Sequence, residues 1–239
     1  MERTRPTPRP GWQALAEQVG FTWHHDSGKP YWDESVAYRF TLPEIEDGIE
    51  APTAELHAMC LDLVAEAVES ERLMTLLDIP EASRDYVADS WKRGDPSLYG
   101  RFDFAYDGQG PAKLYEYNAY TPTSVYETAV FQWLWLAEQM ATGALPANAD
   151  QFNSLHEKLV ERFRAIFPDG GFVHFSSDAE FVEDRQTVRF LEDLARQAGL
   201  DPEFVPIDQI GLNADGRFVD QNDYLIGAMF KLYPWEQML

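Results

Sequence analysis

This 239-residue chain is short of cysteine, of long apolar runs and of positive charge. A single cysteine, Cys60, excludes an intramolecular disulfide and favours a reducing compartment, so we expect a cytoplasmic protein. No stretch approaches the ~18 apolar residues of a membrane-spanning helix, and the Pro-rich start MERTRPTPRP is not a secretory signal. The chain carries 41 acidic and 19 basic residues, a formal net charge of −22 that opposes binding to nucleic acid or anionic membranes.

Phosphate-binding signatures are also missing. No loop combines glycines and a lysine in the pattern that cradles a nucleotide, and Gly108-Gln109-Gly110 is no dinucleotide fingerprint because it lacks a third glycine. We see no internal repeat and no low-complexity segment. The length allows a real hydrophobic core in one or two domains.

Two short strands joined by a Gly-rich turn are predicted in LYGRFDFAYDGQGPAKLYEYN, residues 98–118. Pairing Asp103 with Glu116 sets Arg101 opposite Asn118. Side chains alternate along a strand, so these four polar residues share one face. The opposite face is aromatic and suited to a core: Phe102, Phe104, Tyr115 and Tyr117.

Two carboxylates that face each other repel unless a cation lies between them. A hard divalent cation such as Mg²⁺ would be held by Asp103 and Glu116, with the Asn118 carbonyl as a third oxygen ligand. Arg101 could then hold a phosphate or a developing negative charge beside the ion. The alternative is a solvent-facing hairpin whose charges happen to line up.

Amphipathic patterns predict helices over residues 12–19, 52–77, 84–91, 125–139 and 152–166. The longest is expected to bury a stripe made of Leu56, Met59, Cys60, Leu63, Val64, Ala67 and Val68. Ser124 followed by Glu127 matches a capping box at the start of the 125–139 helix, whose residues are apolar nearly all round. Central burial of that helix would fix the preceding loop, residues 121–123, to the core.

A strand, a helix and a second strand are expected at residues 171–175, 182–198 and 203–207, with Gly199 ending the helix. Such a crossover implies a parallel sheet. Ligands bind beyond the carboxyl ends of parallel strands, and Glu183 at that edge is a candidate contact for the amine of a substrate. We expect an α+β fold, divided into a helical region at 1–97, the hairpin, loop and core helix at 98–140, and a substrate-binding subdomain at 141–239.

Several long strings resemble the glutathionylspermidine synthase family, specifically the N-terminal portion of its synthetase part. They include GFTWHHDSGKPYWDES, ELHAMCLDLV, PSLYGRFDF, LYEYNAYTPTS and FKLYPWEQML, in family order over essentially the whole chain. The resemblance implies an ATP-grasp ligase that uses ATP and Mg²⁺ to join a carboxylate to an amine through an acyl phosphate. The implied substrates are a thiol peptide or other acid and a polyamine or other amine.

The resemblance also implies roles for individual residues. It matches Arg101 to the catalytic arginine, and Arg101 and Asp103 to contacts with the nucleotide. Thr121 and Thr123 match the loop that contacts the thiol peptide. The Mg²⁺ ligands are matched by Asp103, Glu116 and Asn118.

Two features of the chain differ from the family pattern. Tyr120 stands where the family loop has an aspartate, which we expect to weaken Mg²⁺ or substrate binding. The nucleotide-binding lysines and glycine-rich loop of the family follow beyond the length seen here, so we expect a truncated form that is inactive by itself. Three other functions stay open: a module that binds a peptide or polyamine without chemistry, an enzyme fragment, and a hydrolase using Asp103 and Glu116.

Overall fold

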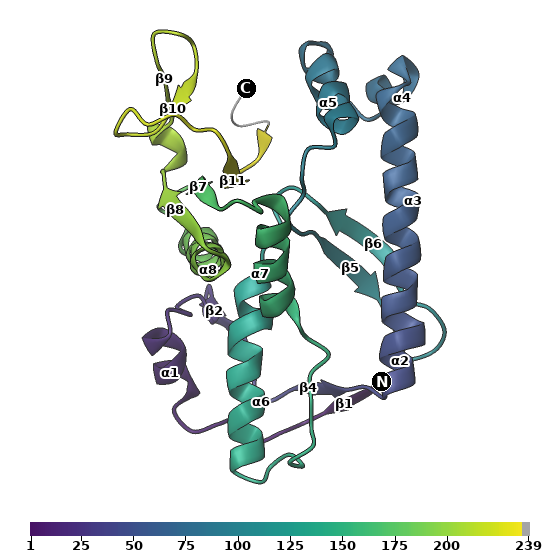
Figure 1. Cartoon of the computed structure of the whole chain (residues 1–239). Helices are drawn as coiled ribbons and strands as arrows, with labels where there is room; N and C mark the ends of the chain where they lie inside the picture. Colours follow the sequence, from purple (N-terminus) through teal and green to yellow (C-terminus); the bar gives the residue numbers. More distant parts are fainter. Residues whose placement is uncertain (236–239) are drawn as a thin grey trace. The chain divides into compact units, whose positions relative to one another are not determined.

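The computed structural model describes residues 1–235, which form two compact units (Figure 1). Unit 1 contains residues 1–2, 39–97 and 102–117, and unit 2 contains residues 3–38, 98–101 and those from 118 onward. The expected α+β class is confirmed, because helices accompany a parallel three-stranded sheet and antiparallel strand pairs. Residues 236–239, at the end of the FKLYPWEQML string, lie outside the described residues.

Unit 1 is built on one long helical run. Thr41 caps its start with a reciprocal capping box to Glu44, which satisfies backbone N–H groups that a helix end leaves unpaired. The elements of the run and those that follow it are α2 (Leu42–Ile45), the π-helical η1 (Glu46–Glu50), α3 (Ala51–Val68), α4 (Glu71–Leu76) and α5 (Glu81–Arg93). A small core of Val68, Met74 and Ala88, with Ile79 against it, joins the last three.

The prediction of one long helix over 52–77 with a buried stripe is wrong. The helix stops at Val68, and Ser70 caps a separate α4 by accepting the Leu73 N–H. Of the expected stripe only Ala67 and Val68 are buried. The exposed or half-buried members are Leu56, Met59, Cys60, Leu63 and Val64. An amphipathic pattern shows that a face is apolar, but not that anything in the chain covers it.

The predicted hairpin is present as β5 (Arg101–Ala105) and β6 (Lys113–Asn118), paired in a two-stranded sheet. Gly108 and Gly110 adopt φ of 86° and 67° in the turn between them, a region that glycine enters without steric cost. Three of the four expected aromatic residues stack, with ring centroids 5.4 Å apart for Phe102–Phe104 and 3.9 Å for Phe102–Tyr117. Tyr115, however, is 80 % exposed, so its expected place in a core is wrong.

Unit 2 contains the parallel sheet, in the order β11–β7–β8. Its members are β7 (Gly171–Ser177), β8 (Leu200–Phe204) and β11 (Met229–Leu232). The crossover helix α8 (Val182–Ala198) has the predicted bounds and ends at Gly199, whose φ is 95°. The second strand begins and ends earlier than predicted, and β11 was not predicted as a strand.

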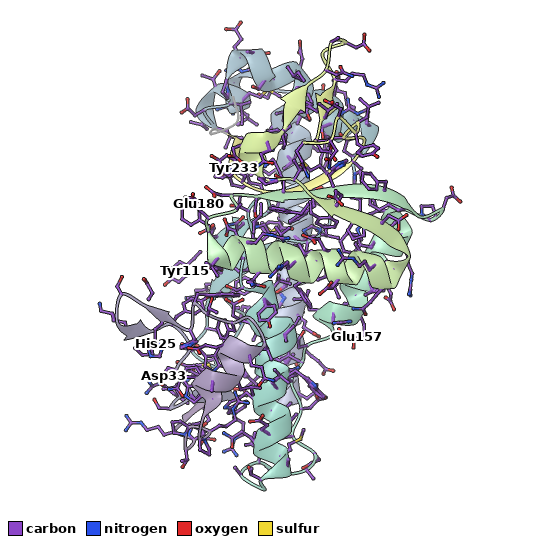
Figure 2. All side chains as sticks on the ribbon, turned by 90° about the vertical axis from the view of Figure 1, so that its left-hand side faces the viewer. His25, Asp33, Tyr115, Glu157, Glu180 and Tyr233 are labelled. Carbon is purple, nitrogen blue, oxygen red and sulfur yellow. The ribbon has the colours of Figure 1, made fainter. Side chains whose placement is uncertain are left out.

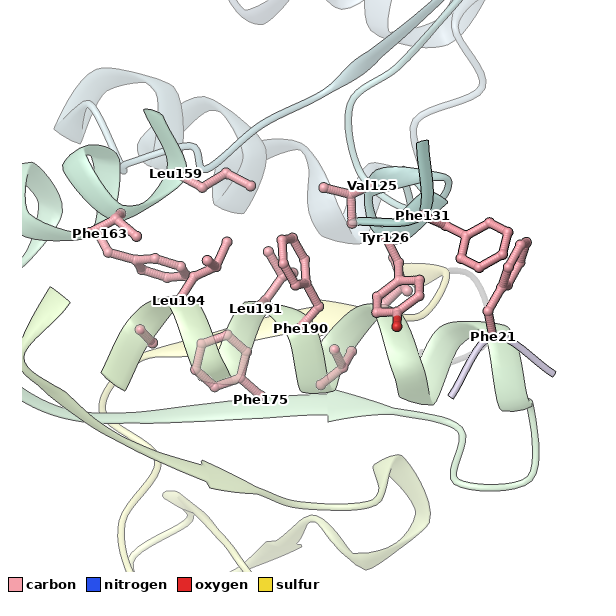
Figure 3. Packing of buried hydrophobic residues seen from close by; sticks show 14 of the residues in the cluster. Phe21, Val125, Tyr126, Phe131, Leu159, Phe163, Phe175, Phe190, Leu191 and Leu194 are labelled. Carbon is pink, nitrogen blue, oxygen red and sulfur yellow. The ribbon is translucent and has the colours of Figure 1, made fainter. Parts of the chain in front are cut away.

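The core of unit 2 lies between α8, the sheet and three further helices (Figure 3). Leu191 and Leu194 of α8 are fully buried (Figure 3). Phe175 of β7 is also fully buried, with its ring centroid 6.0 Å from that of Phe163. The expected inward positions Val188 and Ala195 are also fully buried. The packed helices are α1 (Trp12–Gln18), the π-helical η2 (Glu127–Phe131) continuing into α6 (Gln132–Ala141), and α7 (Leu155–Ile166).

Several short elements complete the described chain and were not predicted. They are β1 (Glu2–Thr4) paired with β4 (Ala37–Arg39), β2 (His25–Asp26) with β3 (Lys29–Pro30), β9 (Gly211–Leu212) with β10 (Phe218–Val219), and the 3-10 turn η3 (Ile207–Gln209). The helix at 152–166 is shorter than expected, since Phe152 lies outside α7 and is 56 % exposed. None of the helices in residues 1–235 has the length and apolar character that crossing a bilayer demands.

Candidate functional site

The hairpin of unit 1 carries the two predicted carboxylates on neighbouring strands. Asp103 is half-buried in the middle of β5, and Glu116 is exposed on β6. Phe102 and Tyr117 stack on one face, so strand alternation sets Asp103 and Glu116 on the other. Carboxylate oxygens on one face are suited to a hard cation such as Mg²⁺.

Within residues 1–235, no cluster of three or more His, Cys, Asp or Glu side chains could hold a metal ion. The predicted Mg²⁺ ligands are not such a cluster, because they are only two carboxylates, Asp103 and Glu116, together with the side-chain amide of Asn118. Its oxygen donors fit Mg²⁺ in chemical type. The assignment of these residues as Mg²⁺ ligands stays a prediction.

Asn118 organises the loop that follows the hairpin. Its side-chain oxygen accepts the backbone N–H groups of Tyr120, at 3.3 Å, and of Thr121, at 3.0 Å. Its amide nitrogen donates to the Thr121 carbonyl at 3.3 Å. This Asx-type turn uses both lone pairs of the Asn118 oxygen, so a metal ion at that oxygen would compete with a backbone donor.

Arg101 and the hydroxyl loop meet within unit 2. The Arg101 guanidinium donates to the Thr123 hydroxyl at 3.4 Å. One residue before Thr123, the Pro122 carbonyl accepts the hydroxyl of Tyr99 at 2.7 Å. Sequence reasoning named Arg101 and Thr123 separately, and the fold brings their side chains together.

Glu183 joins the same group from the first turn of α8. Burial raises the pKa of its carboxyl, the charge of Glu127 raises it further, and a hydrogen bond to Thr123 and the charge of Arg101 oppose the increase. The neighbouring Asp184 is also half-buried, and burial followed by the charges of Glu183 and Asp178 raises its pKa to about 6. The start of α8 therefore presents carboxyl groups that hold protons more tightly than usual.

Glu127 is a buried carboxylate whose hydrogen-bond partners the sequence did not reveal. One of its oxygens accepts the Trp23 indole N–H at 2.8 Å and the Tyr31 hydroxyl at 2.9 Å. The predicted capping box with Ser124 is therefore wrong, because the Glu127 side chain turns to these aromatic residues instead. Burial is the main reason that the pKa of Tyr31 is raised, to about 12. The only signal for this contact was the aromatic string around residues 20–35.

Tyr120 lies beside the site on the loop after Asn118. Its side chain is 46 % exposed. The Lys231 ammonium of β11 lies 5.6 Å from the centre of its ring, in cation–π range. Tyr120 thus faces a cation on the parallel sheet.

The described chain combines a parallel three-stranded sheet with antiparallel strand pairs, one of which carries Asp103 and Glu116. A family profile described as "Glutathionylspermidine synthase preATP-grasp" matches residues 3–239. The chain belongs to this family. The resemblance stated from the sequence is confirmed.

Three relatives show how far the similarity extends. A Haemophilus influenzae protein named provisionally as an acid–amine ligase is 39 % identical over 244 residues, covering 99 % of this chain and 60 % of the relative. The bifunctional glutathionylspermidine synthetase/amidase of Escherichia coli is 29 % identical, covering 82 % of this chain and 31 % of its own length. The trypanothione synthetase of Crithidia fasciculata is 26 % identical, with 77 % and 28 % covered. The chain thus belongs to a family of ligases and spans less than two thirds of each of these relatives.

Proposed function

We propose that this chain is the substrate-holding part of a cytoplasmic, ATP- and Mg²⁺-dependent acid–amine ligase. It would bind a thiol peptide or other acid through Arg101, Thr121 and Thr123, and a polyamine or other amine through Glu183. The observation that carries the proposal is the contact of Arg101 with Thr123, together with the hydrogen bond of Thr123 to Glu183. A cation, a hydroxyl and a carboxyl then form one continuous polar group, as recognition of both an acid and an amine requires.

The nucleotide half of the reaction would use the hairpin. Asp103, Glu116 and Asn118 would hold Mg²⁺, and Arg101 and Asp103 would contact the nucleotide. When bound, Mg²⁺–ATP supplies the phosphoryl group that activates the substrate carboxylate. Arg101 would stabilise the negative charge on that carboxylate as it reacts.

Glu183 suits the amine side of the reaction. An amine must lose a proton before it can attack a carbonyl carbon. Burial raises the pKa of the Glu183 carboxyl, which makes it a better proton acceptor than an ordinary glutamate. Glu183 would bind the ammonium form of the amine and then take up its proton.

The test is amide formation by the protein encoded by the complete open reading frame, with glutathione, spermidine and Mg²⁺–ATP, and product detection by mass spectrometry. Replacing Arg101→Ala should reduce turnover by at least about 100-fold, the scale of losing a donor that stabilises transition-state charge. Arg217→Ala is the matched control, since that arginine is exposed and its side chain has no described partner. Equal turnover in Arg101→Ala and Arg217→Ala would contradict the proposal.

A module that binds the same ligands without chemistry is the second candidate. The contacts of Thr123 with Arg101 and Glu183 would serve ligand binding by themselves. Binding of glutathione or spermidine with no amide product and no phosphate release would support this module over the ligase.

A further inference from the structure

One carboxylate oxygen of Glu127 is buried without a hydrogen-bond partner in the described part of the chain. Its side chain is only 6 % exposed. One oxygen accepts from Trp23 and Tyr31, while the other is shielded from solvent and has no hydrogen-bond partner in the described part of the chain. A buried charged acceptor left unpaired is strongly destabilising, so this position calls for a donor that arrives from outside the chain.

The surroundings of this oxygen define the chemistry of that donor. Glu127 lies close enough to Glu183 for the two carboxylates to repel, which favours a cation between or beside them. The two protein donors on Glu127 come from aromatic side chains, Trp23 and Tyr31. Aromatic rings beside carboxylates are a favourable setting for an ammonium group, since both ring faces and carboxylates attract positive charge.

Tyr31 gives a ligand access to the buried carboxylate. Its side chain is 45 % exposed, although its hydroxyl lies 2.9 Å from the Glu127 oxygen. That oxygen is the one that also accepts from Trp23, and the unpaired oxygen belongs to the same carboxylate. An entering group that displaces the Tyr31 hydroxyl therefore reaches the Glu127 carboxylate, and the ammonium can then donate to the unpaired oxygen as well. A primary ammonium is small and carries three N–H donors, enough for both Glu127 and Glu183.

We infer that Glu127 is a specificity-determining residue that receives a primary ammonium group of the substrate on its unpaired oxygen, beside Tyr31 and Glu183. The inference rests on the proposed function and narrows its substrates to molecules with a free primary ammonium. Two sources share this chemistry, the amino group of the acid substrate and the end of the amine substrate. Both are tested below.

The experiment measures binding by calorimetry to the protein from the complete open reading frame. The ligands are glutathione, an otherwise identical peptide that lacks the amino group, and spermidine. Glu127→Gln removes the charge but keeps an oxygen that can accept from Trp23 and Tyr31. Glu127→Gln should weaken the binding of glutathione or spermidine about tenfold or more, which is the scale of a lost charge-assisted hydrogen bond. It should leave the affinity for the peptide without an amino group unchanged.

Glu180→Gln is the matched control. Glu180 is an exposed carboxylate shortly before α8, so its replacement removes the same charge near the site without removing a described side-chain contact (Figure 2). A loss specific to glutathione assigns the ammonium to the acid, and a loss specific to spermidine assigns it to the amine. Equal weakening of all three ligands, or of none, overturns the inference.

The unchanged protein provides a second measurement in case Glu127→Gln fails to fold. It should bind glutathione or spermidine at least about tenfold more tightly than the peptide without an amino group. No preference for the ammonium overturns the inference, even if amide formation proceeds. Absence of amide product with the preference intact would instead contradict the ligase reaction alone.

Discussion

At the residue scale, Tyr120 occupies the position where the sequence resemblance leads us to expect an aspartate. An aspartate there would add a negative charge close to the Lys231 ammonium and to the loop held by Asn118. Tyr120→Asp in the complete protein should raise ligase turnover at least about tenfold, since a charged contact is worth about 1.5–3 kcal/mol. Turnover is measured with both substrates and Mg²⁺ saturating, and equal rates would show that this position does not limit activity.

Asp184 should make the stability of the fold depend on pH. Its pKa is raised by burial from 3.8 to about 6, so the folded state binds this proton more tightly than the unfolded chain does. This contribution is fully present below about pH 4 and is lost as the pH rises through about 6. Asp184→Asn should therefore increase the free energy of unfolding at pH 7 by on the order of 1 kcal/mol, after discounting for solvent screening of a half-buried group.

Urea unfolding at intervals between pH 4 and pH 7 measures the Asp184 effect. Asp215→Asn is the control, because Asp215 is exposed and its side chain has no described partner. Identical pH profiles for the two variants would contradict the assignment of this titration to Asp184.

At the element scale, the helix that follows residues 121–123 is anchored in the core by the Phe131 ring. Phe131 is fully buried, and its centroid lies 4.7 Å from that of Phe21 and 5.0 Å from that of Trp32. Phe131→Ala should cost about 3–5 kcal/mol of unfolding free energy, because it removes apolar contact and leaves a cavity. Trp133→Ala, two positions along and 49 % exposed, should cost less than about 1 kcal/mol by the same denaturant titration. Similar losses of unfolding free energy in the two variants would contradict a special role of Phe131 in the core.

The elements that could be predicted are those whose local pattern and burial agree. Helix α8 was predicted to the residue because Val188, Leu191 and Leu194 recur with helical spacing and Gly199 permits a left-handed stop. The capping box at Ser124 failed for the opposite reason. The Glu127 side chain instead accepts a hydrogen bond from Trp23, which lies 104 residues away in sequence. A local sequence pattern cannot predict such a contact.

At the scale of the whole molecule, the chain spans 60 % of its Haemophilus influenzae relative. We expect the 239 residues by themselves not to bind ATP tightly, because no lysine-and-glycine loop is present to cradle the phosphates. Calorimetric titration of Mg²⁺–ATP into this chain should give no binding in the micromolar range. Micromolar affinity would mean that the nucleotide contacts lie within these residues.

The exposed apolar residues of α3 and the single cysteine among them have a practical consequence. Cys60 is half-buried between exposed Met59 and Leu61. A thiol-reactive fluorophore can attach to the chain at this one place without mutagenesis. With an environment-sensitive fluorophore, the emission wavelength would report whether α3 is surrounded by water or covered by another polypeptide. Labelling at Cys60 therefore provides a direct assay for association through this helix face.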